Sequence, residues 1–102
     1  MDLKPGSRWK SAVCDTEAVI VRPPGNPGVL ECGGQPMIAH AAERPTGLSP
    51  APDRAGGSAA GKRYSDADTG LEVLCTKAGA GSLAISGRPL ATAEAKKLPS
   101  SD

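Results

Sequence analysis

Short runs of apolar residues, each closed by proline or glycine, organise the chain. The clearest run is residues 18–21, in which three of the four side chains are β-branched, as is typical of a β-strand. Residues 23–28 and 78–81 are rich in Pro and Gly, and we expect each of these segments to close a hairpin. Further predicted strands are 7–13, 29–32, 36–38, 71–75, 82–85 and 88–90. The pattern predicts an all-β fold.

The chain also matches itself at an offset of 53 residues, because residues 15–37 align with 68–90 without a gap. We interpret this match as an internal duplication. The Asp-Thr pair at the start of each copy lies just before the main strand, where an Asx or Ser/Thr turn is typical. The identical positions are Asp15/Asp68, Thr16/Thr69, Gly28/Gly81, Leu30/Leu83, Gly34/Gly87 and Pro36/Pro89.

The repeat divides the chain into three segments. We expect a first β unit at 1–43, a linker at 44–60, and a second β unit at 61–102 that ends in a frayed tail. The linker is dominated by Pro, Gly, Ser and Ala, which bury too little apolar surface to offset the entropy of ordering, so we expect it to be flexible. Each unit is close to the size of about 40 residues below which domains rarely fold alone. The two units are therefore expected to pack on each other or on a partner.

Composition and charge exclude several classes of function. The formal net charge is +1 and the basic residues are scattered, so we expect no nucleic-acid binding. No apolar stretch approaches the roughly 20 residues needed to cross a bilayer, and the first residues lack the apolar region of a signal peptide. We expect no membrane association and a cytoplasmic location. The odd number of cysteines, 3, fits a reducing compartment.

Two short motifs carry a resemblance to a known family. Residues 9–14 read Trp-Lys-Ser-Ala-Val-Cys, and residues 32–37, which follow the Gly/Pro turn, read Cys-Gly-Gly-Gln-Pro-Met. The order resembles desulforedoxin and the amino-terminal domain of desulfoferrodoxin, whose module runs aromatic-Lys-Cys-x-x-Cys, β-branched strand, Gly-rich turn and Cys-Cys-Gly-x-Pro-Met. The resemblance implies a rubredoxin-like fold. With the repeat, it implies two desulforedoxin-like units related by a pseudo-twofold axis, as in the family's homodimer.

The chain departs from that family at the metal. In the family four cysteine thiolates hold iron. Here Ser11 stands at the position of the first ligand and Gly33 at that of the fourth, so only Cys14 and Cys32 remain. The resemblance implies that the iron centre and its electron transfer are lost, while Cys14 and Cys32 still lie close together.

The two remaining cysteines leave three alternatives open. Cys14 and Cys32 can be small buried apolar side chains, which is the commonest fate of free cysteine. They can form a disulfide, or they can bind zinc or iron with Cys75 or His40 completing the site. For Cys75 itself we expect core packing on the face of a strand, and for His40 a solvated or capping role.

No catalytic set emerges from these residues, because the chain has a single histidine and no spacing typical of a nucleophile with its base. We therefore expect a noncatalytic accessory protein, without a cofactor, that docks onto a larger cytosolic enzyme or complex or that self-associates. The alternative is a zinc- or iron-thiolate metalloprotein that uses Cys14 and Cys32. A third class, a thiol enzyme or redox sensor, would use Cys75.

Overall fold

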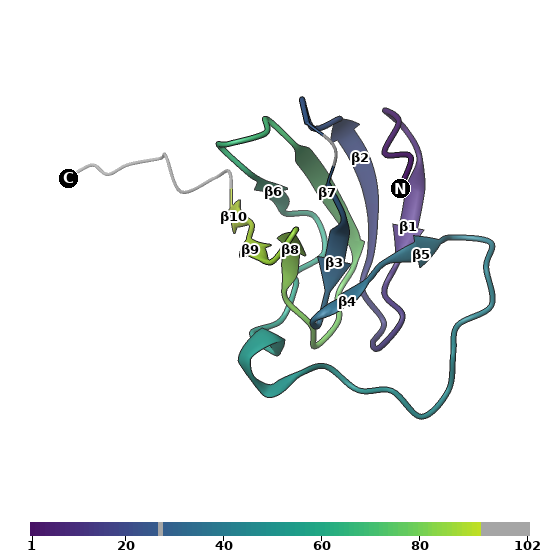
Figure 1. The fold of residues 1–102 in the computed structure, drawn as a ribbon. Helices are drawn as coiled ribbons and strands as arrows, with labels where there is room; N and C mark the ends of the chain where they lie inside the picture. The colour runs from purple at the N-terminus through teal and green to yellow at the C-terminus, as the bar shows by residue number, and fades with distance from the viewer. Residues whose placement is uncertain (27, 93–102) are drawn as a thin grey trace.

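Figure 1 shows the computed structural model, which describes residues 1–26 and 28–92. The expected frayed tail lies outside these residues. The described residues form β-strands and one 3₁₀ turn without an α-helix, so the predicted all-β class is confirmed. None of the described segments is a helix that is long and apolar enough to cross a bilayer. The elements are β1 (Arg8–Lys10), β2 (Glu17–Arg22), β3 (Leu30–Cys32), β4 (Gln35–Pro36), β5 (Ile38–Ala39), η1 (Pro52–Arg54), β6 (Arg63–Ser65), β7 (Glu72–Lys77), β8 (Leu83–Ile85), β9 (Arg88–Pro89) and β10 (Ala91–Thr92).

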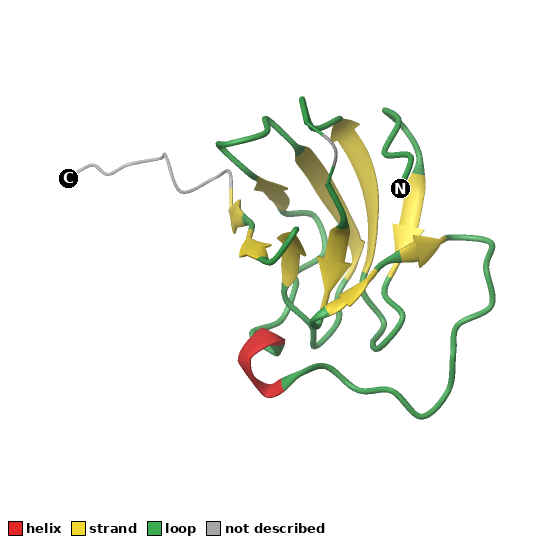
Figure 2. Ribbon diagram, in the orientation of Figure 1, coloured by secondary structure: helices red, strands yellow, loops and turns green. Residues whose placement is uncertain are grey.

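The strands form two antiparallel sheets (Figure 2). The six-stranded sheet has the order β10-β6-β7-β2-β1-β5, and the four-stranded sheet has the order β4-β3-β8-β9. In each sheet one strand from each half of the chain meets at the centre: β2 pairs with β7, and β3 pairs with β8. Because neither half completes a sheet by itself, the two halves form one folded unit.

The pairing between the halves is symmetric. Val19 of β2 lies opposite Leu74 of β7, and the two residues occupy the same position in their strands. Glu31 of β3 lies opposite Ala84 of β8 in the same way. Equivalent residues of the two halves therefore lie opposite each other, as they do when a pseudo-twofold axis relates the halves. Strand order does not test how the repeat arose, so an origin by duplication stays a prediction.

The core lies between the two sheets and takes side chains from both halves. β2 and β7 alternate in the same way, with Ala18 and Ile20 buried in one and Val73 and Cys75 in the other. The predicted core position of Cys75 is therefore confirmed. The other apolar members of the core are Leu3, Leu30, Cys32, Met37, Tyr64, Leu71, Leu83 and Ile85.

The two predicted hairpins at residues 23–28 and 78–81 are wrong. β2 and β3 lie in different sheets and do not pair, and the same holds for β7 and β8. The chain crosses from one sheet to the other at each of these turns. The physical reason is burial: the apolar faces of the strands on either side of a turn must meet across the core, so the turn stacks two strands instead of pairing them.

The structure also corrects the register of the repeat. β1 and β2 precede β6 and β7 by 55 residues, whereas β3, β4 and β5 precede β8, β9 and β10 by the predicted 53. The crossing after β2 spans residues 23–29 and the crossing after β7 spans 78–82, which accounts for the difference of two residues. Cys75 is thus the counterpart of Ile20, a core position in β2.

The segment 44–60, predicted as a flexible linker, contains ordered contacts at its carboxyl end. η1 lies within it, and Ser58 forms an isolated antiparallel bridge with Gly79. The buried Ser58 hydroxyl donates to the Gly81 carbonyl at 2.6 Å. Residues 52–60 therefore make contacts with the rest of the folded unit, although most of them stay exposed.

Candidate dithiol site

The turn between β1 and β2 positions Cys14. The Ser11 N–H donates to the Thr16 carbonyl at 2.8 Å and closes the turn. The Ser11 Oγ then accepts the N–H groups of Val13 at 3.0 Å and Cys14 at 3.1 Å. Because Ser11 is completely buried, its hydroxyl satisfies donors that water cannot reach. A serine at the position where the resemblance implies a cysteine thus still folds this turn.

Cys32 ends β3 and meets Cys14. Cys32 is completely buried, whereas Cys14 is partly exposed. Gly33 and Gly34 follow with φ of +67° and +89°, left-handed values that favour glycine, and turn the chain into β4. The two sulfur atoms lie 3.8 Å apart and both cysteines are free thiols. The expected proximity of these two cysteines is confirmed.

Two further groups are hydrogen-bonded to the Cys14 sulfur. The Cys14 thiol donates to the Thr16 Oγ1 at 3.3 Å, and the Gly81 N–H donates to the Cys14 Sγ at 3.3 Å. Gly81 belongs to the turn between β7 and β8, so the second half of the chain completes a site whose cysteines both come from the first half. The Gly81 N–H favours a negatively charged sulfur, and the Thr16 hydroxyl does the same when it donates to the ionised thiol.

The close approach of the two halves explains one identity of the repeat. A Cβ at Gly81 would lie 2.9 Å from the Cys32 Sγ, closer than real contacts allow. A Cβ at Gly28, its counterpart in the first half, would lie 3.0 Å from Ile85. At each place a turn of one half packs against β3 or β8 of the other half without room for a side chain.

The surroundings of the two thiols shift their pKa values in opposite directions. Burial raises the pKa of Cys14, but hydrogen bonds from Ser11, Thr16 and Gly81 outweigh it and bring that pKa from 9.0 down to about 7. Burial raises the pKa of Cys32 to about 12, and the nearby Cys14 thiolate adds to the increase. Near neutral pH, Cys14 is therefore partly ionised while Cys32 stays protonated.

The donor set does not fit iron held by four thiolates. Cys14 and Cys32 supply two sulfurs, and Ser11 supplies only a hydroxyl. A Cβ at Gly33 would lie 2.5 Å from the Val13 Cγ2, so packing closes the position of the fourth ligand. Within residues 1–26 and 28–92, no three His, Cys, Asp or Glu side chains form a group that could hold a metal. The chemistry of the site is that of its thiols.

The two other candidate ligands lie in different surroundings. The exposed His40 has its Nε2 at 3.1 Å from the Glu17 Oε1. Cys75 is buried in β7, and its thiol donates to the Lys77 carbonyl at 3.2 Å. Burial raises the pKa of Cys75, and the charge on Cys14 raises it further. Cys75 is therefore a protonated core thiol, and neither residue joins the dithiol in a group of three.

The second half contains the same turn without sulfur. The Asp66 N–H donates to the Leu71 carbonyl at 2.9 Å, as Ser11 does in the first half. The Asp66 Oδ2 accepts the Thr69 N–H at 3.1 Å and pairs with the Arg88 guanidinium at 2.9 Å. These hydrogen bonds and the Arg88 charge lower the pKa of the Asp66 carboxyl. Ser11 and Asp66, not Asp15 and Asp68, are the Asx-type acceptors of these turns, whereas the Ser/Thr alternative of the prediction is found at Thr69, whose Oγ1 accepts the Leu71 N–H at 3.3 Å.

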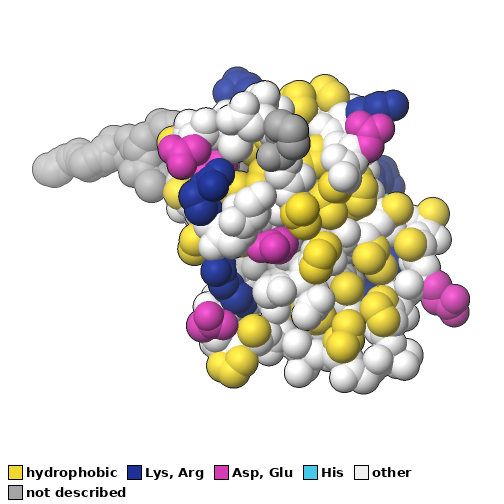
Figure 3. Space-filling model, in the orientation of Figure 1, with side chains coloured by type: hydrophobic (Ala, Val, Ile, Leu, Met, Phe, Trp, Pro, Cys, Tyr) yellow, Lys and Arg dark blue, Asp and Glu magenta, His cyan; other side chains and the backbone are white. Residues whose placement is uncertain are grey.

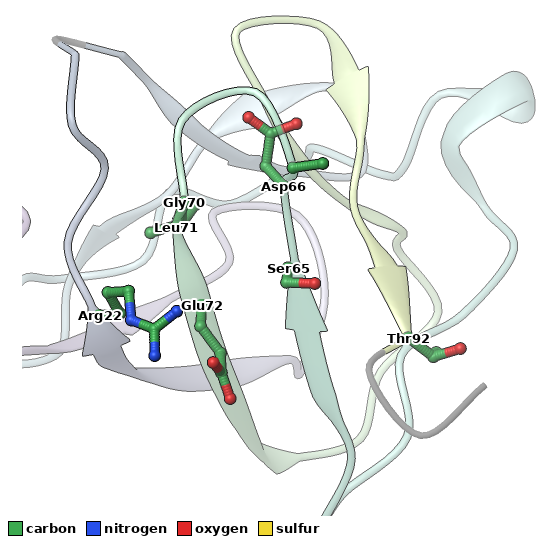
Figure 4. Close-up of a pocket in the computed structure, with 8 residues that line it drawn as sticks. Arg22, Ser65, Asp66, Gly70, Leu71, Glu72 and Thr92 are labelled. Atoms are coloured by element: carbon green, nitrogen blue, oxygen red, sulfur yellow. The ribbon is translucent and has the colours of Figure 1, made fainter. Parts of the chain in front are cut away.

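An open hollow of about 540 Å³ lies beside this second turn (Figure 4). The carboxylates of Asp66 and Glu72 point to opposite ends of it (Figure 4). Asp66 pairs with Arg88, and Glu72 pairs with Arg63 at 3.3 Å. Since the two carboxylates point apart (Figure 4), the hollow does not bring them to one point as a binding site does.

The sequence identifies both cysteines but not the hydrogen-bond partners of Cys14. Thr16 and Gly81 each belong to identities of the repeat, and these identities are the available signal. In the sequence both look like turn residues, because nothing there places residue 81 beside residue 14. Ser11 looks only like a lost ligand, although its hydroxyl holds the turn.

Comparison with known proteins returned nothing similar: no family model, curated protein sequence or solved structure matches the chain. The resemblance to desulforedoxin therefore stays an interpretation of residues 9–14 and 32–37.

Proposed function

We propose that the protein is a small noncatalytic accessory module that binds a larger protein, such as an enzyme subunit. The observation that carries this proposal is the connection between β5 and η1. Residues 45–49 are exposed without interruption, and they include Leu48, whose exposed fraction is 47%. Connections of about 12–15 residues or more without secondary structure are uncommon in compact domains and are usually either functional or linkers.

This connection is held at both ends. The Arg44 Nε donates to the Ser11 carbonyl at 3.0 Å, and the Ala51 N–H donates to the Gly33 carbonyl at 2.9 Å. Pro50 lies against Gly33 as well. Anchoring limits the conformations of the segment between the two ends, so less entropy is lost when a partner binds it.

The surroundings of the connection are also apolar. Figure 3 shows hydrophobic side chains gathering over the middle and lower right of the face that carries β3, β4 and β5, while charged side chains lie mainly around its margins. Exposed apolar patches bordered by polar groups are typical of protein interaction sites. We infer that Leu48 and this face contact the partner together.

Affinity capture from a native lysate tests the proposal. Tagged wild-type protein should retain a larger protein in a fixed ratio, and Leu48→Asp should lose it because a buried, unpaired charge opposes binding. Val21→Asp is the matched control: Val21 is similarly exposed, at 43%, but lies on β2. It should retain the partner. Recovery of free, monodisperse monomer alone, or equal retention by Leu48→Asp, would overturn the proposal.

The rival hypothesis is a zinc- or iron-thiolate protein, which the 3.8 Å separation of the Cys14 and Cys32 sulfurs favours. Elemental analysis of protein purified without added metal separates the two. About one equivalent of metal, lost on Cys14→Ser, would support the rival. A metal content unchanged by Cys14→Ser would count against it.

A further inference from the structure

We propose that Cys14 and Cys32 form a thiol–disulfide exchange site, with a low-molecular-weight disulfide as its oxidising substrate. The inference concerns a chemical activity of the thiols. It goes beyond the proposed binding function and does not depend on it.

The distance between the two sulfur atoms is the first observation that supports the proposal. At 3.8 Å the two Sγ atoms are in van der Waals contact, with no side chain between them. A disulfide needs a sulfur–sulfur distance of about 2.05 Å. Small adjustments of the two side chains supply the difference, and Cys14 lies in a turn outside the strand ladders. The folded protein can therefore close the bond without breaking a sheet.

The two thiols differ in solvent exposure, and this difference gives them different roles. Cys32 has no exposed surface, whereas Cys14 is partly exposed, so a substrate in solution reaches Cys14 first. The Gly81 N–H donates to the Cys14 sulfur at 3.3 Å, and the Thr16 hydroxyl, which accepts a hydrogen bond from the Cys14 thiol at 3.3 Å, can donate to the sulfur once the thiol has lost its proton, so both groups stabilise a thiolate. Attack by a thiolate is the chemistry of this exchange. Cys14 is therefore the attacking residue and Cys32 the resolving residue.

The reaction balances in two displacements. The Cys14 thiolate attacks one sulfur of a disulfide RS–SR, forms the mixed disulfide Cys14–S–SR and releases RS⁻, which takes up a proton. The Cys32 thiol then loses its proton to solvent and attacks the Cys14 sulfur, which forms the Cys14–Cys32 disulfide and releases the second RS⁻. Two electrons pass from the protein to RS–SR, which leaves as two RSH. An excess of RSH reverses both steps.

Cys75 is an internal control for this chemistry. Its thiol is completely buried in β7 and donates to the Lys77 carbonyl, a backbone group of its own strand. We expect Cys75 to stay reduced under conditions that oxidise the pair. Alkylation after denaturation should then find one free thiol in the oxidised protein and three in the reduced protein, which contains 3 cysteines.

The test is incubation of the full chain with oxidised glutathione, followed by intact-mass and peptide-mass measurement. Wild-type protein should lose two hydrogens, form the Cys14–Cys32 bond and recover on addition of reduced glutathione. Cys32→Ser should stop at one glutathionyl group on Cys14. Cys14→Ser should not react, and Cys75→Ala should react as the wild type does.

Three results would overturn the proposal: wild-type protein that accumulates a stable glutathionyl adduct, oxidation that involves Cys75, or no reaction of a correctly folded wild type. Thr16→Val separates the donor's role from folding. It should slow formation of the glutathionyl adduct on Cys32→Ser about tenfold, as expected for one lost hydrogen bond to a charged sulfur. Its circular dichroism spectrum should stay unchanged. An unchanged rate would remove Thr16 from the site.

Discussion

The two equivalent turns of the molecule, 11–16 and 66–71, are closed by the same backbone hydrogen bond but differ in chemistry. In the first turn a buried serine accepts two N–H groups and holds a partly ionised thiol beside a second, protonated thiol. In the second turn Asp66 accepts the equivalent N–H and pairs with Arg88, and no sulfur is present. The comparison shows that this turn needs one buried acceptor at its first position and does not need cysteine. The thiols of the first turn are therefore free to serve a function.

The largest expected effect comes from Gly33, the residue that follows β3. Gly33 has φ of +67° and no room for a Cβ, because Val13 and Pro50 occupy that space. Gly33→Ala adds left-handed strain and overpacking, and should lower the free energy of unfolding by about 2–4 kcal/mol. Urea denaturation measures this loss.

Ser86, the counterpart of Gly33, supplies the control. It has φ of +47°, and its Oγ accepts the Val29 N–H at 3.1 Å. Ser86→Gly relieves strain but loses this hydrogen bond, so the free energy of unfolding should change by less than about 1 kcal/mol. Equal losses for Gly33→Ala and Ser86→Gly would show that the two sites do not differ in packing.

The second effect concerns the acceptor of the first turn. Ser11→Ala leaves the N–H groups of Val13 and Cys14 buried without a partner, which should cost about 2–3 kcal/mol of stability in urea denaturation. Ser11→Cys keeps an acceptor at the same place and should lose less. A larger loss for Ser11→Cys than for Ser11→Ala would contradict the assigned role.

The third prediction follows from the ionisation of Cys14. Its alkylation rate by iodoacetamide should reach half of its maximum near pH 7, two units below the ordinary value of 9.0, because only the thiolate reacts. Thr16→Val should move the midpoint upwards. Peptide mass spectrometry should find Cys32 and Cys75 unlabelled until denaturant is added. A wild-type midpoint near pH 9 would contradict the hydrogen bonding assigned to the sulfur.

The smallest expected effect concerns the carboxylate of the second turn. Asp66 has a lowered pKa, so its carboxylate stabilises the fold above the ordinary value of 3.8, and the gain is lost as the pH falls through the lowered value. Asp66→Asn should be less stable than the wild type at pH 7, and the two should converge in acid. A stability difference that grows as the pH falls would have the wrong sign.

The fold was more predictable than the site. Alternation and β-branched residues locate the central strands, since a half-buried strand leaves that pattern locally, and the repeat predicts two similar halves. The sheet partners are not local: residues 23–29 look like a hairpin turn, although burial of Ile20 against Leu30 makes them a crossing between sheets. The dithiol site was likewise predictable only where its signal is local. Its cysteines were found by motif, whereas the Gly81 donor depends on packing between the halves that no spacing reveals.

The central claim is that pairing between the two halves, without a metal, holds the molecule together. Urea unfolding of protein purified without added metal tests it. Trp9 fluorescence reports on the first half, and Tyr64 fluorescence in Trp9→Phe reports on the second. In each of the two proteins, fluorescence and circular dichroism should show a single transition with the same midpoint. A chelator should not change that midpoint. Separate transitions for the two halves, or a midpoint lowered by the chelator, would contradict the claim.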